Sequence, residues 1–212
     1  MRTCRNTRFA CDKNNFANQG SMKPLLALSR AIDAVNERIG RLVYWCVLIM
    51  VLVSAANAIS RYALSIASNA WLELQWYLFS AVFLLCSGYT LLHNEHIRID
   101  VVAANLSRRK QIWIDIFGTA FFLLPIALYM MWSSWPVFMN AWTSGEISGS
   151  AGGLIRWPAR LLVPVGFFLL TLQGISELIK RFAYLRGLIP DPVEKHEEPA
   201  LELMRIDDQA AK

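Results

Sequence analysis

The strongest constraint on the fold is an uncharged run of nineteen residues, 74–92, in the middle of the chain. At about 1.5 Å of rise per helical residue, the run has nearly the length needed to cross a hydrocarbon core roughly 30 Å thick. Asn69 can cap the start of such a helix, and Glu73 lies in its first turn, where the helix dipole favours a carboxylate. Trp71 adds an amphipathic ring typical of a membrane interface. The run therefore predicts a membrane-spanning helix.

Three further apolar runs have the same character. Residues 42–60 are uncharged, residues 116–138 contain Pro125, which should distort a helix, and the fourth run covers about 161–176. Apolar residues make up 55% of the chain and charged residues 17%, which is unusual for a soluble domain. We predict an all-α integral membrane protein whose four transmembrane helices form one membrane domain, 42–185.

Residues 22–41, which precede the first span, carry one narrow apolar stripe on a charged segment. The segment is too charged to cross a bilayer, so we predict an amphipathic interfacial helix that lies on the membrane surface. The alternative is a cytosolic extension of the first span, but Gly40 would permit a bend between the two segments and favours the surface helix. The stripe consists of Leu25, Leu28, Ile32, Val35, Ile39 and Leu42.

Both ends of the chain are polar and lack a helical pattern. Residues 1–21 are rich in Asn, and we predict that they form a disordered extension. Met22 stands directly before the apolar stripe, which suggests the hypothesis that translation begins there. Residues 186–212 contain Pro and Glu, and we predict a mobile cytoplasmic tail.

The basic residues beside the spans predict the orientation of the chain in the membrane. Eleven lie in the N-terminal flank, the loop after the second span or the C-terminal flank, against three on the other side. Four spans with both termini in the cytoplasm satisfy this distribution, and the loops 61–73 and 139–160 then face outward. The eleven are Lys23, Arg30, Arg38, Arg41, Arg98, Arg108, Arg109, Lys110, Lys180, Arg181 and Arg186, and the three are Arg61, Arg156 and Arg160.

The composition of the spans argues against several function classes. Apart from the thiols of Cys46 and Cys86, the runs hold no ionisable group at mid-membrane depth, whereas a proton-coupled carrier usually keeps one there. Haem ligands would have to be histidines inside the spans, and the histidines lie at a helix end or in the tail. The cysteines lack metal-ligand spacing, and no basic face carries stacking aromatics for nucleic acid. We therefore predict no enzymatic activity, no cofactor, no metal site and no nucleic-acid partner.

Polar residues near the ends of the spans are the candidate functional groups. His93 and His96 could ligate a metal, although a polar cap whose charges pair locally is the simpler interpretation. Arg61 and Glu73 both lie on the outer side, so we predict a salt bridge that closes the first hairpin. We interpret Asn57 as an interhelical hydrogen-bonding residue rather than a ligand. Either a docking surface or an aromatic belt with a flexible loop is formed by Trp135, Trp142, Trp157 and Glu146.

Four short motifs, taken in their order and spacing, resemble a known family. An Arg-Tyr pair ends the first span, a W-x-E-L sequence starts the second, and an N-x-H-I-R-I-D-V run follows it. The fourth span contains P-V-G-F-x-L-L-x-L-Q-G-I-S-E-L. Together these motifs resemble the small membrane subunit of tripartite ATP-independent periplasmic (TRAP) transporters over residues 25–185. The motifs occupy residues 61–62, 71–74, 94–101 and 164–178.

The resemblance implies a function that composition alone does not. In this family the small subunit partners a large multi-spanning permease subunit, which holds the substrate and sodium sites, and a periplasmic substrate-binding protein delivers an organic acid. The chain is then expected to be a non-catalytic subunit of a sodium-coupled importer in the bacterial inner membrane, where it braces the permease scaffold. The rival hypothesis is a membrane anchor of an electron-transfer or other enzyme complex. The residues expected to serve the fold or an interface are Arg61, Trp71, Glu73, Asn94, His96, Arg98 and Asp100.

Overall fold

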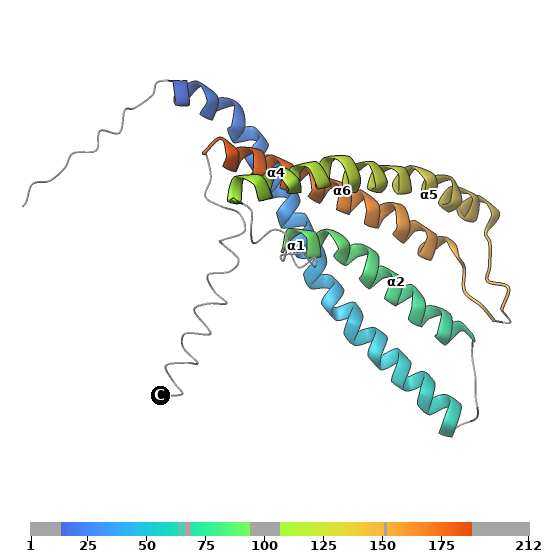
Figure 1. Ribbon diagram of the computed structural model, residues 1–212. Coiled ribbons are helices and arrows are strands. Elements are labelled where there is room, and N and C mark those ends of the chain that lie inside the picture. Colours follow the sequence, from blue (N-terminus) through green and yellow to red (C-terminus); the bar gives the residue numbers. More distant parts are fainter. Residues whose placement is uncertain (1–13, 64, 66–68, 94–106, 151, 188–212) are drawn as a thin grey trace, which may run out of the picture.

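The computed structural model describes residues 14–63, 65, 69–93, 107–150 and 152–187, and its long elements are all helices (Figure 1). Helices α4 and α5 are joined by a π-helical turn, η1, into one long segment. In the described chain four helices are long and apolar enough to cross a membrane, as the sequence predicts. The elements are α1 (Asn14–Ala63), α2 (Asn69–Leu92), α4 (Arg108–Gly118), η1 (Thr119–Leu123), α5 (Leu124–Ser144) and α6 (Trp157–Leu185).

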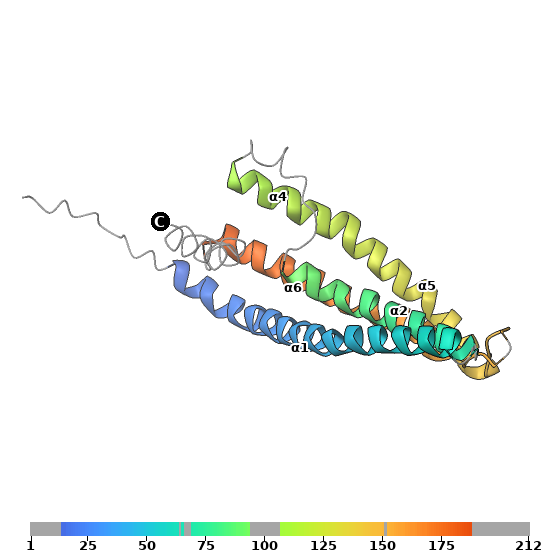
Figure 2. The ribbon, with the colours of Figure 1, turned by 90° about the horizontal axis from the view of Figure 1, so that it is seen from below.

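Helix α1 is one continuous, gently curved helix and not a surface arm followed by a separate span (Figure 2). The bend predicted at Gly40 is wrong, because this glycine has a different use. A Cβ atom built there would lie 2.2 Å from Cδ2 of Tyr89, so Gly40 allows α1 and α2 to approach closely. Residues 14–21, predicted to be disordered, belong to α1, whereas 1–13 lie outside the described residues.

At Pro125, where a kink is expected, the structure has a π-helical turn. Pro125 is the second residue of α5, and Leu124 alone separates it from η1. It has no N–H to donate to the carbonyl of Phe121, four residues earlier, so the regular ladder cannot continue there. A wider turn before the proline accommodates this missing bond.

Helix α6 is the centre of the arrangement. Figure 1 shows α2 between α1 and α6, with α5 on the other side of α6, in an open fan. Helix α6 packs against α1, α2 and α5, and it holds ten buried residues, whereas α2 and α5 hold three each. Because the fan is open, many large apolar side chains of the other helices are exposed on its outer surfaces.

Candidate functional site

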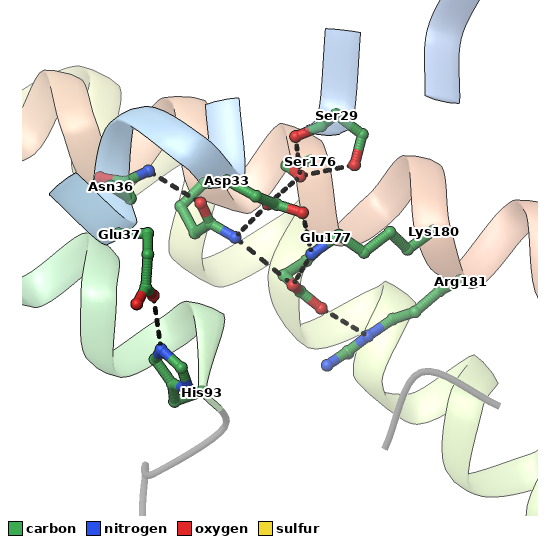
Figure 3. Close-up of polar contacts among 10 residues, drawn as sticks. Ser29, Asp33, Asn36, Glu37, His93, Ser176, Glu177, Lys180 and Arg181 are labelled. Atoms are coloured by element: carbon green, nitrogen blue, oxygen red, sulfur yellow. Dashed lines mark hydrogen bonds and ion pairs between the residues drawn. The ribbon is translucent and has the colours of Figure 1, made fainter. Parts of the chain in front are cut away.

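The most concentrated polar chemistry lies where the N-terminal half of α1 crosses α6. Polar side chains of α6 recur at intervals of three and four residues, which places them on one helix face. A matching polar stripe on α1 faces them, as Figure 3 shows. We call this set of residues the α1–α6 junction. Its members are Ser29, Asp33 and Asn36 from α1 and Gln173, Ser176, Glu177, Lys180 and Arg181 from α6.

Asp33 is the hub of the junction. Its Oδ1 accepts hydrogen bonds from the Oγ of Ser176 at 2.8 Å and from the Nε2 of Gln173 at 3.0 Å. Its Oδ2 lies 2.9 Å from the ammonium of Lys180. The Oγ atoms of Ser176 and Ser29 are a further 2.7 Å apart. One carboxylate therefore gathers three donors from α6, and charge-assisted bonds of this kind are stronger than neutral ones.

The position of Asp33 determines how the side-chain amide of Gln173 is hydrogen-bonded. Gln173 is fully buried, and because its amide N–H₂ faces Asp33, its carbonyl oxygen must accept, which it does from the Nδ2 of Asn36 at 2.7 Å. The Asn36 Oδ1 then points at α2, where a Cβ atom built on Gly88 would lie 2.5 Å away. Among the described residues this buried oxygen has no hydrogen-bond partner, and it lies against the Cα–H group of Gly88. Three helices thus meet at a position that requires glycine.

The charged end of the junction continues onto α4. Glu177 is 3% exposed, and its carboxylate accepts from the ammonium of Lys180 at 2.8 Å. Arg181 is 5% exposed and reaches the Oδ2 of Asp115 at 3.3 Å. Its Nε also lies 3.9 Å from Glu177. Buried charges are costly unless they are paired, and the paired arrangement here fixes α6 against both α1 and α4.

The end of α2 is held to α1 by a histidine. The Nε2 of His93 lies 2.9 Å from Glu37, and Glu37 also pairs with Arg41, one helical turn further along α1, at 3.2 Å. The ring of His93 packs on that of Tyr89, with centroids 4.3 Å apart. The partner of His93 is thus a carboxylate of α1, and the polar-cap interpretation of His93 and His96 stays a prediction. Several candidates beyond His93 lie outside the described residues: Asn94, His96, Arg98 and Asp100.

At the other end of the fan, Glu73 clasps the loop 145–156. This carboxylate is 3% exposed, and it accepts hydrogen bonds from the Ser148 hydroxyl and, at 2.6 Å, from the backbone N–H of Leu154. The predicted salt bridge with Arg61 is therefore wrong, because Arg61 is exposed and both Glu73 oxygens face the loop. A carboxylate at a helix start can satisfy backbone donors, and in this case the donor belongs to a distant loop.

The same loop is closed by its own contacts. Ile147 and Ile155 form an isolated antiparallel bridge, and Glu146 lies 3.1 Å from Arg156 and 2.8 Å from Arg160. Of the predicted outer aromatics, Trp142 and Trp157 meet edge to face with ring centroids 4.7 Å apart, and Trp135 contacts Phe138; Trp71, Trp135 and Trp142 are all exposed. Glu146 is thus used within the loop, and the docking role of the aromatic residues stays a prediction.

The apolar stripe of α1 points away from the junction. Only Ile32 is buried, at 8% exposure, and Ile39 is half-buried, while Leu25, Leu28 and Val35 are exposed. Three polar side chains of α1, Ser29, Asp33 and Asn36, thus pack against α6, whereas the basic side chains of the same segment are exposed. Its contact with a membrane surface stays a prediction.

Sequence reasoning missed the pairing residues of the junction. Asp33 lies in the segment predicted to be a surface helix, and Gln173 and Ser176 lie inside the fourth motif, where the sequence alone gives them no partner. The signal in the sequence is a polar stripe of the same period on each of the two helices. Four polar residues of α6 at positions i, i+3, i+4 and i+7 (Gln173, Ser176, Glu177, Lys180) match a stripe of the same period on α1.

Comparison with known proteins identifies the family. A family model described as the DctQ component of tripartite ATP-independent periplasmic transporters matches residues 50–183, which is more than half of the chain. The matched region covers the C-terminal part of the first span, Lys23–Ala63, the whole of the second and third, and all but the last two residues of the fourth, Trp157–Leu185. Comparisons with curated proteins and with solved structures give no match. The chain therefore belongs to the DctQ family, the small membrane component of TRAP transporters.

Proposed function

We propose that this chain is a non-catalytic brace for the large permease subunit of a TRAP transporter. The observation that carries the proposal is that α1 bonds polar side chains inside the chain and leaves large apolar side chains exposed. Asp33 and Asn36 are bonded inside the chain, whereas Leu25, Leu28 and Val35 on the same helix are exposed. A membrane helix with paired polar groups and a free apolar face is suited to packing against lipid or another membrane helix.

The partners follow from the family. DctQ components work with a large permease and a substrate-binding protein. We assign the transport pathway to the permease, and a role in rigid support to this chain, because the charged groups at the centre of the junction pair with one another. The distribution of basic residues supports a bacterial inner-membrane location with both termini in the cytoplasm. Sodium coupling and an organic-acid substrate are carried over from the resemblance.

The test is co-purification followed by reconstitution. A tagged form of the chain, expressed with its cognate permease, should retain the untagged permease through purification in mild detergent. Liposomes that contain both subunits and receive the binding protein should accumulate an organic acid in a sodium-dependent manner, and liposomes with this chain alone should not. Uptake by the chain alone would contradict the proposal. Failure to retain the permease, together with a haem absorption spectrum, would favour an electron-transfer anchor.

A further inference from the structure

The outer halves of α1 and α2 are separated by a groove of about 660 Å³ with a mixed lining. It contains two polar side chains, Ser54 from α1 and Gln75 from α2, among apolar ones. Asn57 lies one turn beyond Ser54 on the same face of α1 and is 9% exposed. The apolar lining residues are Met50, Val51, Leu72, Trp76 and Phe79.

The hydrogen-bonding groups of these three polar residues are not used inside the described chain. Within residues 14–63 and 69–93 and the other described segments, neither amide nor the Ser54 hydroxyl has a hydrogen-bond partner. Several other hydroxyls of the spans bond to a carbonyl of their own helix, as Ser80 does to Trp76 at 2.8 Å. Ser54 lacks this self-contained arrangement, so its hydroxyl is available to a partner.

A second groove, by contrast, has no polar side chain in its lining. It lies between α5 and α6, and all its lining residues are apolar. Lipid chains can fill such a groove without leaving a polar group unsatisfied. They cannot do so between α1 and α2, because hydrocarbon offers no hydrogen bonds to an amide. The lining of the second groove is Met131, Trp132, Trp135, Pro164, Val165 and Phe168.

We propose that the α1–α2 groove binds one transmembrane helix of the large permease subunit. This helix presents a hydroxyl, amide or free backbone carbonyl to Asn57 and Gln75, and an apolar surface to Trp76 and Phe79. Polar side chains of this kind join membrane helices, and they set which faces meet. The inference rests on the proposed function and adds to it the location and the chemistry of the contact.

The first test removes the amides. The double variant Asn57→Leu with Gln75→Leu makes both positions apolar and keeps the groove similar in size. The matched control is Asn140→Leu, which replaces an exposed amide on α5 outside the groove. Co-expressed with the cognate permease, the double variant should retain at least about tenfold less permease than the unaltered chain. The control should retain the normal amount. Equal retention by the double variant and the control would overturn the groove proposal and leave the proposed function intact.

The second test leaves the amides in place, so a folding defect cannot mimic the result. A photoreactive p-benzoylphenylalanine replaces Ser54 in the assembled complex, and irradiation should link this chain to the large permease subunit. Cross-links to lipid alone would overturn the groove proposal. If the unaltered chain retains no permease at all, the proposed function fails, and this result differs from each of the others.

Discussion

Helix α6 is held at its two ends by different chemistry. At the α1–α6 junction, side chains of two helices bond to each other, and Asp33 alone gathers three donors. At the outer end, the single carboxylate of Glu73 bonds to a hydroxyl and a backbone N–H of one loop. The junction therefore fixes how two helices pack. The Glu73 contacts, which we call the clasp, hold only the loop 145–156 against the start of α2. Damage to the junction should destabilise the whole fan, and damage to the clasp should stay local.

The largest expected effect is at the hub of the junction. Asp33→Ala removes the acceptor of three donors and leaves the N–H₂ of Gln173, which is fully buried, with only its long 3.4 Å contact to Glu177. We expect a loss of about 3 kcal/mol of stability, seen as a marked drop in apparent melting temperature in detergent. Asp33→Asn keeps one acceptor oxygen and should lose less. Equal melting temperatures for Asp33→Ala and the unaltered chain would show that the junction does not hold the fan.

A close contact of α2 and α6 between these two ends should give the next effect. A Cβ atom on Gly166 would lie 2.9 Å from the backbone oxygen of Leu84, which cannot move aside as a flexible side chain could. Gly166→Ala should therefore cost about 1–3 kcal/mol. The control Gly118→Ala meets no atom within 4 Å and should be neutral or slightly stabilising. If both substitutions shift the melting temperature alike, the packing of α2 on α6 is not as described.

A local effect is expected at the clasp. Glu73→Ala removes both acceptor oxygens, so the contacts with the Ser148 hydroxyl and the Leu154 N–H are both lost. Hydrogen exchange at the Leu154 amide should accelerate about tenfold. Exchange within α1 and at the core of α6 should not change. Faster exchange throughout the helices would mean that the clasp is as central as the junction.

The smallest effect is expected beside the junction, on the surface. Arg41 pairs with Glu37 one turn away, but its side chain is 74% exposed. An exposed pair of this kind contributes no more than about 0.5 kcal/mol, so Arg41→Ala should leave the melting temperature nearly unchanged. A loss of stability as large as that of Asp33→Ala would show that the exposed Arg41–Glu37 pair contributes as much as the contacts of Asp33.

The sequence predicts the spans well because hydropathy and length are local properties. The uncharged runs locate all four membrane helices, and Pro125 marks the irregular turn. The partners of charged residues are not local. From the sequence, Glu73 is expected to form a salt bridge with Arg61, its neighbour across the first hairpin. Its partners in the structure, Ser148 and Leu154, lie 75 and 81 residues away in a loop without a regular pattern.

The junction shows the same limit in a different form. Asp33 and Gln173 are 140 residues apart, and each stripe alone resembles an ordinary polar helix face. The sequence alone suggests a bend at Gly40. The reason for a glycine there is the close approach of Tyr89 on α2, which is a property of the tertiary structure. Matching polar stripes of equal period on two membrane helices would have been the more informative pattern.

The most direct test of the account asks whether the polar face of α1 packs on α6. In a chain whose native cysteines are replaced, Ser29→Cys and Ser176→Cys place two thiols where hydroxyl oxygens lie 2.7 Å apart. The account predicts rapid, nearly complete disulfide formation in native membranes under mild oxidation, and little for the pair Leu28→Cys and Ser176→Cys, because Leu28 is exposed on another face. Absence of the first cross-link, or equal yields from the two pairs, would contradict it.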